Sequence, residues 1–225
     1  MPKMRRIIPV DAAVHLVNRG NNKQYIFNND TDKLRYYSLM LELKQENNIT
    51  IFHYCLMDNH PHLVVWLNDK SRLSKFMKQL SLSYYSYYKK AYGYSGHLWQ
   101  GRFKSNIIDI DSYLLQCGKY IELNPVRARM VTLPQDYLFS SYNFYAYGKA
   151  DSLLTPSPVY LALSSSPEAR RKHYIDFVVD SSIINADRLK KQQFIGNLDF
   201  VEKLECLYGV KNEMFRHGRP KKPEK

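Results

Sequence analysis

Two histidines separated by one residue form the most chemically suggestive pair in the chain. His60 and His62 flank Pro61 at the start of an apolar, β-branched run. Because side chains alternate along a strand, both rings would lie on one face, about 6.5–7 Å apart along the backbone, where they could bind one metal ion. A chance His-x-His is expected roughly 0.2 times in a chain of this composition, so a solvated polar pair stays open as the alternative.

A third ligand and a nucleophile are candidates on a helix further along the chain. Tyr120 and Asn124 are four residues apart, which places them one turn apart on one helix face. A phenol and an amide oxygen could therefore approach the same point over a sheet. Two other interpretations stay open: Asn124 before Pro125 is typical of a helix break or a new N-cap, and Tyr120 is one of 19 tyrosines.

The charge of the chain favours a polyanionic partner. The formal net charge is +12, and lysines and arginines occur in short clusters along the whole chain. Such a footprint makes nucleic acid the leading partner, and tyrosines could add stacking on unpaired bases. The alternative is that each cluster is a solvated helix face and that most tyrosines are packing residues.

Composition limits the broad class of the protein. With 225 residues, 44% hydrophobic and 24% charged, the chain is typical of a globular protein. It contains no apolar run of the roughly 18 residues that a membrane span needs, and no secretion signal. Three widely spaced cysteines argue against a disulfide framework and a thiolate zinc site. We therefore expect a soluble, unsecreted protein in a reducing cytoplasm, with no membrane partner.

The elements that must position these residues follow an order of strand, helix, strand, strand, helix, strand, and then a third helix. Hydrophobic periodicity and turn signals place them at residues 12–18, 31–48, 49–57, 60–67, 71–92, 103–110 and 113–124. This order is a split βαβ unit, so we predict an α+β fold with a ferredoxin-like antiparallel sheet and helices on one face.

The last third of the chain differs in composition from the rest. After residue 148 it becomes rich in serine and proline, and short basic helical segments follow. We predict a catalytic domain over residues 1–148 and a helical extension over residues 149–225, which ends in a mobile basic tail from His217.

Three segments of the sequence together resemble a known family. They are HLVNRGNNKQYIF, HYCLMDNHPHLVVW and GHLWQGRFKSNIIDIDSYLLQCGKYIELNPVRARMV. They resemble the HUH single-tyrosine transposases, and among them the REP-associated tyrosine transposases of bacteria, over roughly residues 10–180. In that family a bulky hydrophobic residue stands between the two histidines, whereas this chain has Pro61. Proline lacks an amide hydrogen, so the strand either lies at a sheet edge or loses one ladder bond.

The resemblance implies an HUH nuclease fold and a specific chemistry. Similar proteins cut single-stranded hairpin DNA through a tyrosine that becomes linked to the 5′ phosphate, and Tyr120 matches that nucleophile. His60, His62 and Asn124 match the residues that hold a divalent ion. Imidazole-rich sites generally favour zinc, but the resemblance implies Mg²⁺ or Mn²⁺.

Other residues in the matching segments are expected to handle DNA. Trp99 and Gln100 offer a stacking ring and an amide that can read a base edge, and nearby cations can bind phosphates. The alternative is a tryptophan that fills the core beside two solvated cations. The full set of predicted DNA-binding residues is Arg19, Asn21, Trp99, Gln100, Arg102, Lys104, Arg127 and Arg129.

The sequence thus favours a metal-dependent transposase that cleaves and rejoins REP-like hairpin DNA. Two alternatives stay open: a catalytically inactive nucleic-acid-binding regulator on the same fold, and a related HUH relaxase or replication initiator. We expect a bacterial, cytoplasmic, nucleoid-associated protein. A monomer is favoured because of the C-terminal extension, and a homodimer is the alternative.

Overall fold

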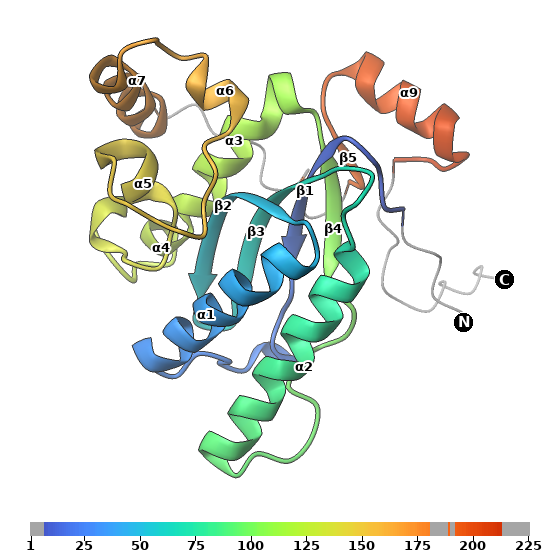
Figure 1. Ribbon diagram of the computed structural model, residues 1–225, viewed down its shortest axis with the longest axis vertical. Helices are drawn as coiled ribbons and strands as arrows, with labels where there is room; N and C mark the ends of the chain where they lie inside the picture. Colours follow the sequence, from blue (N-terminus) through green and yellow to red (C-terminus); the bar gives the residue numbers. More distant parts are fainter. Residues whose placement is uncertain (1–6, 181–188, 190–191, 213–225) are drawn as a thin grey trace, which may run out of the picture.

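A five-stranded sheet organises the chain, in the spatial order β2-β3-β1-β4-β5 (Figure 1). The computed structural model describes residues 7–180, 189 and 192–212. The strands are β1 (Ala12–Val17), β2 (Thr50–Met57), β3 (His60–Leu67), β4 (Lys104–Ile108) and β5 (Phe194–Ile195). The first four pair antiparallel, while β5 runs parallel to β4.

Two long helices cover one face of the sheet, as predicted. They are α1 (Asp30–Glu46) and α2 (Leu73–Tyr92), which lie together in front of the strands in Figure 1. Their apolar residues pack with Val14, Leu63 and Val65 of β1 and β3 in the main core. The α+β class and the ferredoxin-like arrangement of these elements are confirmed.

The third long helix differs from the prediction, because it covers the opposite face. Helix α3 (Ile110–Glu122) packs in a second core, where its Leu114 and Ile121 join Val64 of β3 and Ala13 of β1. The prediction that helices cover only one face of the sheet is therefore wrong. The physical reason is visible in β3, whose run of consecutive apolar residues after His62 gives both faces of the strand a surface that must be buried.

Helix α3 begins at a capping residue and ends where a second, short helix starts. Asp109 accepts a hydrogen bond from the amide of Asp111 and so caps the first turn. At the other end Leu123 closes α3 and at once begins the short helix α4 (Asn124–Arg127), whose second residue is Pro125. Tyr120 thus lies in the last turn of α3.

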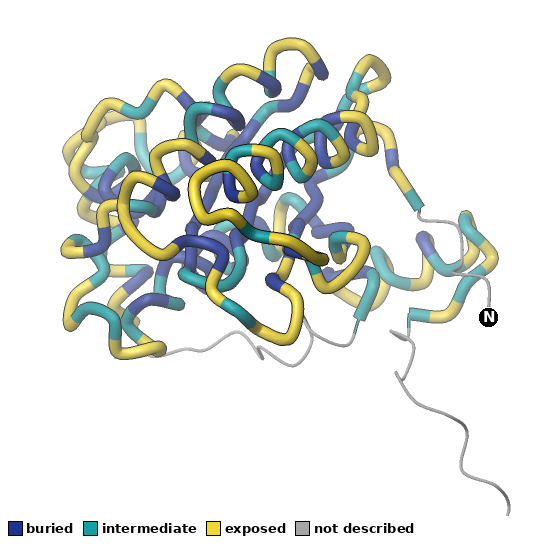
Figure 2. Tube along the Cα trace, turned by 90° about the horizontal axis from the view of Figure 1, so that it is seen from below, coloured by how far each residue is buried: buried dark blue, intermediate teal, exposed yellow. Residues whose placement is uncertain are grey.

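The remaining elements wrap the edges of the sheet. They are η1 (Asn21–Lys23), η2 (Pro134–Asp136), α5 (Tyr142–Tyr147), α6 (Pro158–Leu161), α7 (Pro167–Val179) and α9 (Leu198–Tyr208). Figure 2 shows the buried trace running through the middle of the molecule and exposed residues on its outer turns. No helix in the described ranges combines the length and hydropathy that crossing a bilayer would require.

The C-terminal extension is not purely helical. Its strand β5 adds to the edge of the sheet beside β4, so the sheet is mixed where an antiparallel one was expected. Helix α9 packs there through Leu204 against Phe194 and Ile107. The boundary at residue 148 stays a prediction, since the extension also contacts the first part through a bridge between Leu154 and Ile51. The tail from His217 lies outside the described residues.

Candidate active site

His60 and His62 lie on the sheet face that α3 covers. Their ring centroids are 4.7 Å apart, with the ring planes at 68°. The expectation that strand alternation brings both rings to one face therefore matches the geometry. The hairpin that carries them turns at Asp58 and Asn59, as predicted, with Met57 opposite His60.

Pro61 is accommodated inside the sheet and not at its edge. Strand β3 lies between β2 and β1, and the ladder to β1 ends where Val17 pairs with His62. Pro61 is one residue beyond that pair, and its carbonyl still accepts from the amide of Asn18 at 3.4 Å. The amide hydrogen that proline lacks falls at the end of the ladder, so only a terminal bond is lost.

Tyr120 reaches the histidines from above the sheet. Its ring centroid is 6.2 Å from that of His62, and the two rings are almost perpendicular at 84°. The tyrosine is 9% exposed, so the ring is held by packing in the second core. Tyr120, His60 and His62, predicted from two separate segments, therefore meet in one place.

Asn124 does not act as a helix cap. Leu123 is the N-cap of α4, and no side-chain cap bond is formed there. The side-chain nitrogen Nδ2 of Asn124 is buried and has no hydrogen-bond partner among the described residues. A half-turn of the amide would bring its carbonyl oxygen to the same position, and the role of Asn124 as a metal ligand stays a prediction.

His15 is a member of the site that sequence reasoning missed. It lies in β1, and its Nε2 is 2.8 Å from Nδ1 of His62. The signal was a histidine in the middle of an apolar strand, but its meaning depends on how β1 pairs with β3. That register places His15 opposite Val64, next to His62 on the same face.

The imidazoles of the site are neutral at physiological pH. Burial lowers the pKa of His60 to about 4, and the nearby positive charge of Arg19 acts in the same direction. Burial also holds the pKa of His62 well below its usual value, and the neighbouring His60 adds to this. A neutral imidazole is the form that binds a metal ion.

The donor set fits a divalent ion with mixed nitrogen and oxygen ligands. Nε2 of His62 is buried without a hydrogen-bond partner in the described part of the chain, which leaves a nitrogen directed at no protein group. Within the same part of the chain, no group of three or more His, Cys, Asp or Glu side chains is placed to hold a metal. Two imidazoles and one amide are compatible with Mn²⁺ or Mg²⁺, whose remaining positions water and substrate oxygens would fill.

Arg127 contacts the tyrosine directly. Its guanidinium carbon is 5.2 Å from the ring centroid of Tyr120, and its Nη1 donates to the Tyr120 carbonyl oxygen at 2.9 Å. Burial lowers the pKa of Arg127, and the charge of an ionised Tyr120 would oppose this. Arg127, which was expected to follow the DNA backbone, therefore lies against the phenol ring of Tyr120. Arg129 is exposed, as Arg127 is, and has a positive φ of 58°.

The loops after β1 and before β4 lie side by side. The amide of Gln100 donates to the carbonyl of Arg19, and the amide of Asn21 donates to the carbonyl of Leu98, both at 2.8 Å. The side chains of Arg19, Asn21 and Gln100 are exposed. Four predicted DNA-binding residues, including Trp99, are thereby brought into one double loop.

Trp99 serves the core more than a binding surface. Its Nε1 donates to the carbonyl of Ser81 at 3.1 Å, and its ring lies 6.1 Å from Tyr84 and 6.5 Å from Tyr36. The alternative of a core-filling tryptophan therefore describes most of this side chain.

Lys104 and Arg102 are both exposed. Lys104 pairs with Val17 across β4 and β1, and Val17 pairs with His62 across β1 and β3. Lys104 therefore lies in the same row of cross-strand neighbours as His62.

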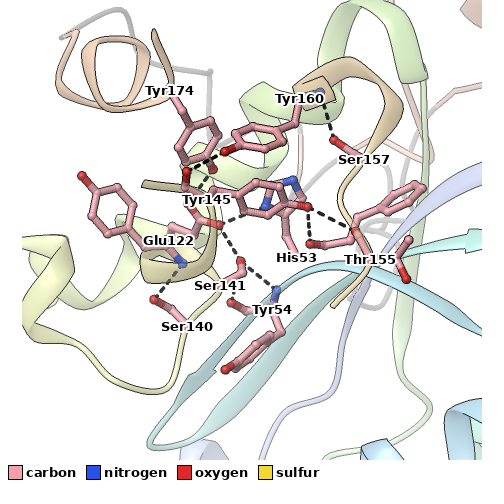
Figure 3. Close-up of polar contacts among 12 residues, drawn as sticks. His53, Tyr54, Glu122, Ser140, Ser141, Tyr145, Thr155, Ser157, Tyr160 and Tyr174 are labelled. Carbon is pink, nitrogen blue, oxygen red and sulfur yellow. Dashed lines mark hydrogen bonds and ion pairs between the residues drawn. The ribbon is translucent and has the colours of Figure 1, made fainter. Parts of the chain in front are cut away.

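A buried polar network anchors the helix that carries Tyr120. Glu122, two residues further along α3, accepts from Ser141 Oγ at 2.5 Å and from Tyr174 OH at 2.7 Å, and its Oε1 lies 3.0 Å from His53 Nδ1. Figure 3 shows these side chains converging from β2, α3, the residue just before α5, and α7. Sequence reasoning missed this network, because its members are spread over more than 100 residues of the chain.

Comparison with known proteins is consistent with this geometry. The family model described as IS200-like transposase matches residues 10–124. The chain belongs to the IS200-like transposase family. The resemblance predicted from the histidine and tyrosine segments is thus confirmed, and with it a transposase role in general. No curated protein sequence matches the chain.

Two solved structures are similar to the chain. One is a REP-associated tyrosine transposase bound to a REP hairpin, with 19% identity and a TM-score of 0.54, over 69% of this chain and 92% of that one. Another is a putative transposase from Deinococcus radiodurans R1, with 14% identity and a TM-score of 0.38, over 61% of this chain and 95% of that one. The first supports the fold of this IS200-like transposase.

Proposed function

We propose that this transposase cleaves and rejoins single-stranded hairpin DNA of the REP type through a covalent link between Tyr120 and a 5′ phosphate. The observation that carries the proposal is the meeting of Tyr120 from α3 with His60 and His62 from β3. The similar structure bound to a REP hairpin supports the choice of substrate. The enzyme would act on nucleoid DNA in the bacterial cytoplasm.

The reaction requires one bond to form as another breaks. The Tyr120 oxygen attacks the scissile phosphorus, the bond from phosphorus to the 3′ oxygen breaks, and the departing 3′ oxygen takes up a proton. A phenol, with an ordinary pKa of about 10, is a better leaving group than a sugar hydroxyl. The link can therefore be attacked by a 3′ hydroxyl, which rejoins a strand and releases the tyrosine.

A divalent ion, held by His60, His62 and Asn124, would polarise a non-bridging oxygen of the scissile phosphate and offset the charge that develops on it. The protein residues supply positioning. The second core holds the ring of Tyr120, and Arg127 places a positive charge over that ring, which favours the phenolate over the neutral phenol.

DNA contacts are proposed for the double loop and its neighbours. Arg19, Asn21 and Gln100 present exposed polar groups there, and Arg102 and Lys104 follow in the chain. Exposed cations bind phosphates, and the amides can read base edges. Trp99 supports this loop from inside the core, and Arg129 adds an exposed cation beyond α4.

We also propose that the protein acts as a monomer. Tyr120 and His62 approach each other within one chain, so no second copy is needed to complete the site. A dimer that exchanges its tyrosine helices would show itself by restored cleavage when variants lacking Tyr120 and lacking His60 are mixed. A monomer predicts no restoration.

The test uses a labelled hairpin oligonucleotide with Mg²⁺ or Mn²⁺, and a denaturing gel that detects a protein–DNA adduct. We expect the wild type to form the adduct and Tyr120→Phe to lose it, with cleavage reduced on the order of 10⁴-fold. Tyr113→Phe is the matched control, because it removes another hydroxyl from the same helix. Equal adduct from Tyr120→Phe and wild type would refute the nucleophile. Hairpin binding without cleavage by the wild type, with either ion, would favour the inactive regulator.

A further inference from the structure

Helix α3 has a second packed face, which does not lie on the sheet. Tyr120 packs in the second core, toward the strands. Leu115 and Leu123 instead pack against a third core, which lies in α5, α6 and α7. The spacing 115, 119, 122 and 123 follows one stripe of a helix, so Lys119 and Glu122 share the face that meets these helices. The buried residues of the third core are Tyr142, Tyr145, Ala146, Tyr160, Tyr174 and Val178.

Lys119 binds the C-terminal end of α7. It is 3% exposed, and its Nζ donates to the carbonyl oxygens of Phe177, at 2.8 Å, and of Asp180, at 2.6 Å. The same Nζ lies 4.9 Å from the ring centroid of Phe177. The last carbonyls of a helix have no partner within the helix and carry a partial negative charge, so they suit an ammonium group. A lysine of α3 therefore caps α7, and the two helices cannot separate without uncovering these groups.

Glu122 binds the same helix at a second point. It is fully buried, and the hydroxyl of Tyr174 in α7 donates to its Oε2 at 2.7 Å (Figure 3). Tyr174 is also fully buried, in the third core. A buried carboxylate is tolerated only while hydrogen-bond donors surround it. The contact between α3 and α7 is therefore made by two charged side chains that both need α7 in place.

We propose that α7 sets the position of Tyr120 for its attack on the phosphorus, with Lys119, Glu122 and Tyr174 as positioning residues. Lys119 comes directly before Tyr120 and Glu122 two residues after it, so α7 holds the last turn of α3 on both sides of the nucleophile. The three residues act through the backbone of that turn. The inference rests on the proposed function, since it concerns the same tyrosine.

A fixed last turn has a definite value for the reaction. Attack requires the phenol oxygen to lie about 3–3.5 Å from the phosphorus, and a displacement of about 1 Å can lower the rate about 10²-fold. The ends of a helix open more readily than its middle, and Tyr120 lies near such an end.

Stability alone does not explain charged residues on this face of α3. Apolar side chains of similar size in place of buried charged groups are often neutral or stabilising. Hydrogen bonds from charged groups have a defined direction, which apolar contacts lack. Lys119 and Glu122 thus give the turn one fixed position, which leucine or methionine would not do.

The test measures the single-turnover rate of adduct formation and the hairpin affinity separately, in the full-length protein with Mn²⁺. Lys119→Met keeps the length of the side chain but removes the donor, and Tyr174→Phe removes only the hydroxyl. We expect the rate to fall about 10-fold in each variant and about 10²-fold in the double variant, with the hairpin affinity within about 2-fold of the wild type. Lys119→Arg keeps N–H donors and should recover most of the rate.

Two control variants make equivalent changes away from the contact between α3 and α7. Lys44→Met removes an ammonium group that donates to two backbone carbonyls between α5 and α6, at 2.6 and 2.8 Å. Tyr160→Phe removes a hydroxyl from the third core that donates to the carbonyl of Tyr145 at 2.9 Å. We expect both controls to form the adduct at the rate of the wild type.

Three results would overturn the inference. One is an unchanged rate in the folded double variant. Another is an equal loss of rate in the two controls, which would tie the rate to stability and not to α7. The third is a loss of hairpin affinity as large as the loss of rate, because the residues would then bind DNA. If the double variant does not fold, Tyr174→Phe decides, since it keeps the ring in the core.

Hydrogen exchange followed by NMR separates this inference from the proposed function. The amides of residues 119–123 should exchange faster in the double variant than in the wild type, while exchange over residues 114–117 stays the same. A wild type that forms no adduct would remove the proposed function and leave this exchange difference intact. A double variant that forms the adduct as fast as the wild type would remove only the inference on α7.

Discussion

His53 and the pair His60 and His62 lie on the same face of the sheet, under the same helix, with different surroundings. His53 is fully buried, lies 3.0 Å from a carboxylate oxygen of Glu122, and stacks on Tyr145 with ring centroids 4.4 Å apart. His60 and His62 have neutral partners instead, Asn59 for the first and His15 for the second.

The difference shows how one residue type can serve structure or chemistry. A carboxylate beside His53 and the close backbone of Gly118 leave no space for an ion, since a Cβ on that glycine would be 2.8 Å from His53 Nε2. Removal of one partner from a buried pair of this kind is strongly destabilising. His62 also has one bonded ring nitrogen and one without a partner in the described residues, as His53 does, but its bonded neighbour is the imidazole of His15 and not a carboxylate.

Among the three variants that test this difference, His60→Ala should give the largest effect on activity with the least effect on the fold. We expect cleavage to fall by about 10²–10³-fold or more, because an ion that stabilises the phosphate contributes several kcal/mol to the transition state. The melting temperature should stay close to that of the wild type, since His60 is only partly buried. The adduct gel and a thermal melt measure the two quantities. Normal cleavage, or a large loss of stability, would break the distinction between the two groups.

Glu122→Ala should give the opposite result, a large loss of stability. Removal of the carboxylate leaves His53, Ser141 and Tyr174 without their partner in a buried place, and such losses cost about 3–5 kcal/mol. Denaturant unfolding measures the change. The control is Glu168→Ala, whose exposed ion pair with Arg171 should contribute nothing measurable. Below its melting temperature, Glu122→Ala should still bind Mn²⁺. Loss of the ion in a folded variant would show that the two groups are not independent.

Gly118→Ala is the smallest of the three changes and tests the fit of α3 on β2. The added Cβ would lie 2.5 Å from Cε1 of His53, and overpacking of this kind costs about 1–3 kcal/mol, partly offset by the roughly 1 kcal/mol that alanine gains in a helix. Unfolding free energies of the single and double variants with His53→Ala give the coupling. We expect the cost of the methyl group to disappear when His53 is absent. Strict additivity would contradict direct contact between these residues.

Local periodicity determined much of the candidate site. Two-residue spacing on a strand brought His60 and His62 to one face, and four-residue spacing on a helix brought Tyr120 and Asn124 to one side. The first relation needs only the geometry of a single strand, and the structure has it. The second stays a prediction, because α3 ends at Glu122 and Asn124 begins α4. The predicted hairpin turn at Asp58 and Asn59 is also a local property, and the structure has it.

Only the tertiary structure decided which elements meet. It placed α3 on the second face of the sheet, brought His15 to His62 across a strand pair, and set Arg127 against Tyr120. It also turned two carbonyls near β5 toward Asn106. These contacts join segments that are tens of residues apart, and they depend on strand register and on how the cores pack. One sequence reports the period of each element but not the register between elements. For this reason the shared face of His60 and His62 was predictable, and the contact of His15 with His62 was not.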